Sequence, residues 1–537
     1  MAINLNANDP NHIYRLGEAL HDNSLIERAI SCFLKAIDMG LNIGACWNRL
    51  GNAYYVLKEF GKALECFKTA TEIQPDDAIY LANLGLTLRA LDKTEESIPV
   101  LAKSAELQPT NGRRWNDLGN SYFKLKYYSN AADCYIKAIE RKPNDGIYHS
   151  NLASAYKELS RLEDAIMEYK LSLSYAPLDP DVYNELGMIY HRLENYQKAV
   201  VFFKKAIRLD GKNPFFLSNL AEAYLKLADT TKAIRALTEL TVLDAGNAVR
   251  WNELGNVQLL IPDPATAISS YRTAISLEPN NAVFHCNLAL GLREIRLFDQ
   301  AWHSFATAVR LDPNNATIWN FWGNTYYSLQ NYKNAARCFA KAISLDPPVS
   351  VYHFNIGKAY YSLGKMQRAI DALTDATRLD PADAEKWNEL GNAYFANNDF
   401  ANAKISYRKA IDTDPKTSAS KSSVYLSNLG GALNMLNEKV DAIAILTQAL
   451  ALETNAQCYY YLAIAHASQN PDEAAKFCLK AFEIEDSEKL YVDLLLQMCK
   501  KLDHAASKTY VEAALVVDPS NVDLLAFKND APDSLLT

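Results

Sequence analysis

Residues 387–395 read WNELGNAYF, and near-copies of this stretch occur four more times in the chain. The copies are WNRLGNAYY from Trp47, WNDLGNSYF from Trp115, WNELGNVQL from Trp251 and WNFWGNTYY from Trp319. Their starting points differ by 68 residues or a multiple of 68. A fixed internal period is typical of a repeat architecture, so it overrides the several globular domains that 537 residues would otherwise suggest.

The underlying unit is half that period, 34 residues. With Gly44 as position 1, a large apolar residue recurs at position 4, Leu at 7, Gly or Ala at 8, Tyr at 11, Ala at 20, an aromatic residue at 24, Ala at 27 and Pro at 32. Positions 4, 7, 8 and 11 share one face of a helix, and so do 20, 24 and 27. Each unit is therefore predicted to form two antiparallel amphipathic helices, and the Pro ends it.

This pattern resembles the tetratricopeptide repeat across roughly residues 10–519. The resemblance implies an all-α fold, an α-solenoid in which about fifteen helix-turn-helix units stack into a right-handed superhelix. It also implies that the first helices line the concave side. The units begin near residues 10, 44, 78, 112, 146, 180, 214, 248, 282, 316, 350, 384, 423, 456 and 488, and the last two are degenerate.

Five segments follow from this register. Residues 1–9 are a lead-in, and residues 10–415 hold units 1–12 in strict 34-residue register. Residues 416–422 are a polar, Ser-rich insertion, expected to form a longer turn. Residues 423–519 hold units 13–15, and residues 520–537 are expected to form a short capping helix and a frayed acidic tail.

Positions 2, 5, 6, 9, 12 and 13 of the first helix form the face that is not used for packing within the repeat, and we call this face the wall. Asparagine recurs on the wall. Units of a first kind carry Asn at positions 5 and 9, and units of a second kind carry it at position 6. In the unit of Asn184, Met188 replaces the second Asn. The candidate peptide-binding residues are Asn48, Asn52, Asn83, Asn116, Asn120, Asn151, Asn184, Asn219, Asn252, Asn256, Asn287, Asn320, Asn324, Asn355, Asn388, Asn392 and Asn428.

An Asn amide offers donors and an acceptor on a short side chain, so it bonds an extended backbone whatever the ligand's side chains are. Each bond contributes only about 0.5–1.5 kcal/mol, and many along one segment would hold it firmly. The Asn rows are similar to those of the helical arm of O-linked N-acetylglucosamine transferase and of the peroxisomal import receptor. That resemblance implies a protein partner, namely an extended or disordered segment, held by a non-enzymatic scaffold or adaptor.

Other readings of the same rows stay open. The asparagines would also serve as a ladder that bonds adjacent repeats and sets the superhelical pitch. In that case the chain would be a structural solenoid, or a self-assembling one that forms a homo-oligomer, and it would make its contacts with its convex face and ends. A third alternative is a substrate-recruiting arm that acts with a separate glycosyltransferase chain.

Three further residue classes fall on or near the wall. Glu185, Glu253 and Glu389 would either favour ligands with Lys or Arg, or pair with basic residues of adjoining units, namely Lys157, Arg192, Lys226 and Arg293. Aromatic residues at position 12 would line the groove or pack between first helices; they include Tyr55, Phe123, Tyr327, Tyr361 and Phe395. Histidines at position 4 are expected to pack where other units have Trp or Leu; they are His149, His285 and His353.

The remaining composition excludes several function classes. The sequence has no HExxH, GxxxxGK[ST] or GxSxG motif and no acidic calcium loop, so we expect no enzyme, cofactor or metal. Its nine cysteines form no CxxC pair and are expected to be small buried thiols. A formal charge of −8 without a long basic block disfavours nucleic acid, and no apolar run predicts membrane insertion. The N-terminal residues lack a secretory signal, which predicts a cytoplasmic location.

Overall fold

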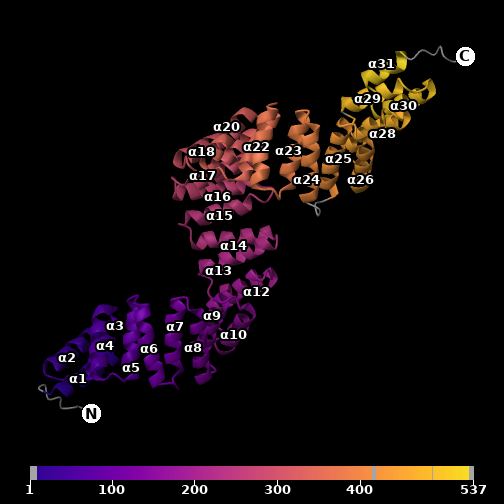
Figure 1. Cartoon of the computed structure of the whole chain (residues 1–537). Helices are drawn as coiled ribbons and strands as arrows, with labels where there is room; N and C mark the ends of the chain where they lie inside the picture. Colours follow the sequence, from indigo (N-terminus) through magenta and orange to yellow (C-terminus); the bar gives the residue numbers. More distant parts are fainter. Residues whose placement is uncertain (1–8, 414–418, 487, 531–537) are drawn as a thin grey trace. The chain divides into compact units, whose positions relative to one another are not determined.

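The computed structural model describes residues 9–413, 419–486 and 488–530, and these contain 31 α-helices and no β-strand. The chain divides into two compact units, Met1–Ile261 and Pro262–Thr537. Within each unit every helix packs on the next one along the chain, and contacts between distant parts of the sequence do not occur among the described helices. Each unit is thus a row of stacked helix pairs (Figure 1), which confirms the all-α solenoid.

The helices alternate between the first and second helix of a repeat. The first unit contains α1 (Pro10–Asp22), α2 (Ile26–Asp38), α3 (Gly44–Val56), α4 (Phe60–Ile73), α5 (Ala78–Ala90), α6 (Thr94–Leu107), α7 (Gly112–Lys124), α8 (Tyr128–Arg141), α9 (Gly146–Glu158), α10 (Leu162–Tyr175), α11 (Pro180–Arg192), α12 (Tyr196–Leu209), α13 (Pro214–Lys226), α14 (Thr230–Leu243) and α15 (Ala248–Gln258). The second unit contains α16 (Pro264–Leu277), α17 (Ala282–Glu294), α18 (Phe298–Leu311), α19 (Ala316–Ser328), α20 (Tyr332–Leu345), α21 (Ser350–Ser362), α22 (Met366–Leu379), α23 (Ala384–Ala396), α24 (Phe400–Thr413), α25 (Ala419–Met435), α26 (Lys439–Leu452), α27 (Ala456–His466), α28 (Pro471–Ile484), α29 (Lys489–Cys499), α30 (His504–Val517) and α31 (Val522–Asp530).

Local chemistry sets the ends of these helices. Most first helices begin after an Asp or Asn whose side chain accepts a backbone N–H, as Asp145 does from the N–H of Ile147 at 3.1 Å. Most first helices end before a residue at position 15 with left-handed backbone, for example Lys58 with φ 60° and Ala228 with φ 56°. The turn into the second helix therefore repeats with the same geometry.

The two helices of most repeats approach each other closely at a small residue at position 8. A methyl group added to Gly51 would lie 2.7 Å from the ring of Phe67, and one added to Gly119 would lie 2.6 Å from the ring of Tyr135. These distances are shorter than van der Waals contact, so at these two repeats glycine lets the ring at position 24 pack directly against the backbone of the first helix; Ala153 and Ala289 occupy position 8 in the repeats of Tyr169 and Phe305.

The first helices of successive repeats contact one another within each unit, as α3 does with α5, α5 with α7, and α21 with α23. Among the described second helices, only α28 and α30 contact each other to a similar extent. The first helices are therefore closer together than the second helices, so the wall lies on the inner side of each stack. The right-handed sense of the superhelix stays a prediction.

Two places depart from a uniform repeat. The Ser-rich insertion was expected as a longer turn, but its residues 419–422 form the first turn of α25; residues 414–418, like 1–8, 487 and 531–537, lie outside the described residues. The second place is α15, which has 11 residues where most first helices have 13; α27 and α29 in the degenerate last repeats are equally short. Position 15 of the repeat that contains α15 is Pro262, whose ring fixes φ near −65°, so the usual left-handed turn residue is excluded there.

Candidate peptide-binding wall

Asparagines of adjacent repeats are hydrogen-bonded to each other along the wall. In each case Nδ2 of an Asn at position 6 donates to Oδ1 of the Asn at position 5 in the preceding repeat. The bonds are Asn83 to Asn48 at 2.8 Å, Asn151 to Asn116 at 2.8 Å, Asn219 to Asn184 at 2.9 Å, Asn355 to Asn320 at 2.8 Å and Asn428 to Asn388 at 2.9 Å. The side chains that the sequence places in two kinds of unit therefore form one structural pair.

The two partners of a pair differ in burial. Asn48, Asn116, Asn252, Asn320 and Asn388, all at position 5, are only 6–8% exposed. The asparagines at position 6 are half-buried, as are Asn52, Asn120, Asn324 and Asn392 at position 9, and Asn256 is exposed. Position 5 is thus an internal acceptor between repeats, whereas positions 6 and 9 reach the surface of the wall.

Some of the position-9 asparagines accept a hydrogen bond from a tyrosine at position 24 of the same repeat. The Tyr135 hydroxyl donates to Oδ1 of Asn120 at 2.8 Å, and the Tyr407 hydroxyl donates to Oδ1 of Asn392 at 2.9 Å. We did not predict this role from the sequence, although the choice of Tyr instead of Phe at position 24 was a usable signal.

The paired asparagines keep further hydrogen-bonding groups. No atom of the candidate peptide-binding asparagines is among the buried side-chain atoms that lack a partner in the described part of the chain, although Oδ1 of Asn434, at position 12, is one of those atoms. Each remaining amide group is therefore either bonded or open to water. Because most repeats carry Asn either at position 9 or at position 6, in alternation, the wall presents about one such amide per repeat.

The three wall carboxylates have different surroundings. Glu185 pairs with Lys157 of the preceding repeat at 2.7 Å, which confirms the pairing between adjoining units there. Glu253 instead pairs with Arg250 of its own helix at 2.9 Å. Burial raises the pKa of the Glu389 carboxyl, and the nearby Lys358 ammonium offsets that effect only in part. Glu389 is the wall carboxylate best placed to meet a cationic ligand.

Aromatic rings at position 12 pack edge-on against the ring five residues later, at the start of the second helix. The centroid distances are 5.1 Å for Tyr55 and Phe60, 5.3 Å for Phe123 and Tyr128, 5.2 Å for Tyr327 and Tyr332, and 5.2 Å for Phe395 and Phe400. The packing partner thus lies within the same repeat and not on the neighbouring first helix. Tyr361 has Met366 at the matching place and is 36% exposed on the wall.

Histidines at position 4 replace tryptophan as hydrogen-bonding residues. Nε2 of His149, His285 and His353 lies 2.8–2.9 Å from the carbonyl oxygen of the residue six places earlier. The indole N–H of Trp115 and Trp387 donates to the equivalent carbonyl at 3.2 and 3.0 Å. These contacts support the packing role expected from the shared position.

The cysteines and the acidic side chains show no built metal site. All nine cysteines are free thiols, and eight are buried. Burial raises the thiol pKa of Cys46, Cys286 and Cys478 to about 12. In the described ranges no group of His, Cys, Asp and Glu side chains is arranged to hold a metal ion. Over the same ranges, no helix has both the length and the apolar character that a membrane crossing requires.

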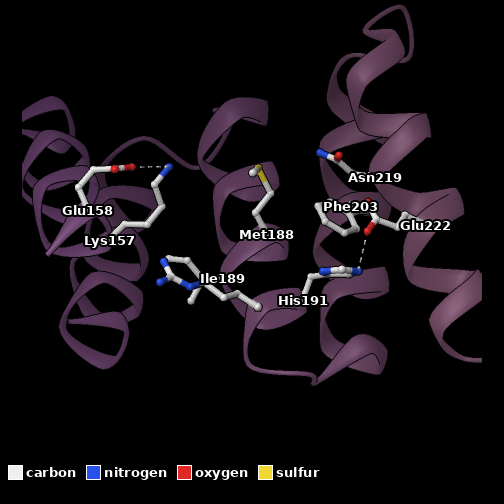
Figure 2. A pocket seen from close by; sticks show the side chains of 9 residues that line it. Lys157, Glu158, Met188, Ile189, His191, Phe203, Asn219 and Glu222 are labelled. Carbon is white, nitrogen blue, oxygen red and sulfur yellow. Dashed lines mark ion pairs between the residues drawn. The ribbon is translucent and has the colours of Figure 1, made fainter. Parts of the chain in front are cut away.

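One cavity of about 380 Å³ opens on the wall of the first unit, among α9, α11, α12 and α13. Figure 2 shows Met188 at its centre, with Lys157 and Glu158 on one side and Asn219 and Glu222 on the other. Met188 occupies the position where other units of its kind have Asn. The cavity thus coincides with the one break in the Asn pattern that the sequence shows.

Comparison with known proteins identifies the repeat. Models of the tetratricopeptide repeat match residues 44–77, 78–111, 112–145, 180–213, 202–235, 323–364 and 354–417. No curated protein matches the chain.

Solved structures with a similar fold include a chain of the APC/C hetero-tetramer Cut9-Hcn1, at 15% identity, 91% coverage of this chain, 96% of that chain and a TM-score of 0.38. Another is the MamA protein, at 22% identity, 32% coverage of this chain, 92% of that chain and a TM-score of 0.29. At these identities and TM-scores, neither likeness bears on function.

Proposed function

Because this chain belongs to the tetratricopeptide repeat proteins, which are in general non-catalytic protein-interaction scaffolds, we propose that it binds extended polypeptide segments along its wall. The observation that supports the proposal most directly is that the asparagines at different positions differ in burial and in hydrogen bonding. Position 5 is buried and bonded to the next repeat, whereas positions 6 and 9 present their amides at the surface. A buried partner that fixes a surface amide is the arrangement a preformed binding site needs.

The spacing of these amides suits a main chain in extended conformation. An amide at each repeat bonds backbone groups and ignores side chains, so affinity would grow with the length of segment engaged. The half-buried Glu389 adds a preference for Lys or Arg in the second unit. We infer that the partner is a disordered or extended segment of another protein, and that no reaction is catalysed.

A second candidate function has its own support. The Asn-to-Asn bonds themselves favour a ladder that maintains the geometry between repeats. If that were their whole role, the chain would be a structural solenoid, and its contacts would lie on the second helices and the ends.

Two matched sets of substitutions separate the candidates. The surface set changes Asn52, Asn120, Asn324 and Asn392 to Ala, and the buried set changes Asn48, Asn116, Asn320 and Asn388 to Ala. The probe is an array of unstructured 20-residue peptides of varied sequence, scored by fluorescence binding. We expect the surface set to lose binding and the buried set to lower Tm more strongly than the surface set, in which the loss of Asn120 and Asn392 removes the acceptors of two tyrosine hydroxyls. Unchanged binding by the surface set would assign the wall to architecture alone.

A further inference from the structure

The row of position-9 residues changes its chemistry within the first unit. On α9 this residue is Ser154, whose hydroxyl lies 2.9 Å from the hydroxyl of Tyr169 behind it. On α11 it is Met188, and the residue behind is Phe203, which has no hydroxyl group. An apolar pair therefore follows a polar pair along the row; Leu86 and Leu101 occupy the same two positions on α5 and α6, earlier in the first unit. The next residue in the row is Glu222 on α13, so the apolar spot is limited to α11.

Looser packing between repeats opens the cavity at this spot. α10 and α11 contact each other less extensively than α8 and α9 or α12 and α13 do. Ile189 and Phe203 line the cavity while each is only 1% exposed, and Met188 is 43% exposed. A thioether side chain is flexible and polarizable, so it adapts to apolar groups of different shape. The floor of the cavity thus offers an apolar contact that water does not satisfy.

Among the charged side chains that line the cavity, one cationic side chain has no carboxylate partner in the described part of the chain and can bind a ligand. Lys157 is held by Glu185 at 2.7 Å and Glu158 at 3.8 Å. The ring of His191 points toward Glu222, at 3.7 Å (Figure 2). The Arg192 guanidinium donates to the Ser160 hydroxyl at 3.3 Å, and it has no carboxylate partner among the described residues. Although Glu158 and Glu222 also line the cavity, Arg192 is therefore the rim group that can pair with a carboxylate of a ligand.

We propose that this cavity is a specificity pocket for the bound segment, taking an apolar side chain the size of Leu or Met with an Asp or Glu beside it on Arg192. The inference rests on the proposed function, because the segment must already lie along the wall. Asn219 lines the same cavity and belongs to the Asn rows, so main-chain contacts and the pocket are continuous. The wall then has a sequence preference at this repeat, whereas the Asn rows alone have none.

Peptide selection by the full chain tests the pocket. The probe is a library of 15-residue peptides with eight randomised positions. We expect the wild-type chain to enrich Leu or Met next to Asp or Glu. Met188→Asn introduces the residue that other units of this kind carry, so it should keep the fold and the Tm of the wild-type chain. It should lose the apolar enrichment and bind a selected peptide about tenfold more weakly. Arg192→Gln, at an exposed position, should lose only the acidic enrichment.

The outcomes distinguish this inference from the proposed function. Identical enrichment by wild type and Met188→Asn would overturn the pocket while leaving the wall as a binding surface. Enrichment of apolar residues without any acidic neighbour would overturn the role of Arg192 and with it the proposal as stated. If the wild-type chain selects no peptide at all, the proposed function fails and the pocket fails with it.

Discussion

At the scale of single residues, the structure explains why Asn occurs at two neighbouring wall positions. Asn at position 5 lies in the contact between repeats, where an amide oxygen needs a donor, and Asn at position 6 of the next repeat supplies it. An offset of 35 residues, as between Asn116 and Asn151, is visible in the sequence and becomes 40 only between Asn388 and Asn428, across the Ser-rich insertion. A ladder of bonds between adjacent repeats was one of the two interpretations of these asparagines, and the sequence could not decide between them because the bond depends on the rotation between repeats.

The pairing makes a quantitative prediction for Asn116 and Asn151. A double-mutant cycle of Asn116→Ala and Asn151→Ala should show a coupling of about 1 kcal/mol in the free energy of unfolding, since each single change removes the same hydrogen bond. Urea unfolding followed by circular dichroism measures it. The control cycle pairs Asn116→Ala with Asn219→Ala, whose bond is to Asn184, and it should be additive. Equal coupling in both cycles would argue against a direct bond.

The buried carboxyl of Glu389 predicts a pH dependence. Because burial raises its pKa, the folded chain binds a proton there at a pH at which the unfolded chain does not. The free energy of unfolding therefore falls as the pH rises from the ordinary glutamate pKa through the raised value. Glu389→Gln should be more stable than wild type at neutral pH and equal to it below pH of about 4.

Thermal unfolding of both proteins across that pH range measures the effect. Glu185→Gln is the matched control, since Glu185 occupies the same repeat position but pairs with Lys157. Its stability should change little at neutral pH, and it should not exceed wild type. A Glu389→Gln variant that is less stable than wild type at neutral pH would contradict this account.

At the scale of the helix pair, sequence spacing predicted most of the structure. Leu390 and Gly391 are buried as the stripe requires, and the cysteines and position-4 histidines occupy packing sites. The Met188 cavity was not predicted, because its existence depends on how α9, α11 and α13 are spaced. Pro262 was a signal that sequence reasoning missed, since a proline at position 15 excludes the turn that its neighbours use.

The close approach of the two helices predicts how much a Gly→Ala substitution at position 8 lowers the free energy of unfolding. Gly119→Ala would place Cβ 2.6 Å from the Tyr135 ring and should lower the free energy of unfolding by about 1–3 kcal/mol. Gly61→Ala on α4 is the control, because nothing lies within 4 Å of the added methyl. That change should stabilise the chain by about 0.5–1 kcal/mol, since alanine favours the helix. Equal effects at the two sites, measured by chemical denaturation, would refute the packing argument.

At the scale of the whole molecule, the chain consists of two compact units that meet in sequence at Ile261 and Pro262. In a repeat stack each repeat contacts its neighbours, so stability is approximately a sum of local terms. Each unit has core clusters of its own, such as the one around Leu237 and Leu240 in the first and the one around Leu495 in the second. Separate folding of the units is therefore expected.

Two fragments test this expectation. Residues 1–261 should give a helical circular dichroism spectrum and a cooperative thermal transition. Residues 1–193 are cut at the same repeat position but between α11 and α12, which pack on each other inside the first unit. This shorter fragment should melt several degrees lower than residues 1–261, because it loses α12–α15, which pack on one another and on α11 within the first unit. If the two fragments had the same Tm, a cut at the unit boundary would be no less disruptive than a cut inside the first unit, which would contradict separate folding of the units.

The most direct test of the central claim is site-specific photo-crosslinking with a benzophenone side chain at position 361 or 405. Tyr361 is 36% exposed on the wall, and Ile405 is 54% exposed on the second helix α24, so both probes face solvent on opposite sides of the same unit. After irradiation with a pool of unstructured peptides, mass spectrometry locates the adducts. We predict peptide adducts at position 361 and none above background at 405. Adducts at 405 with none at 361 would contradict the assignment of the wall as the binding surface.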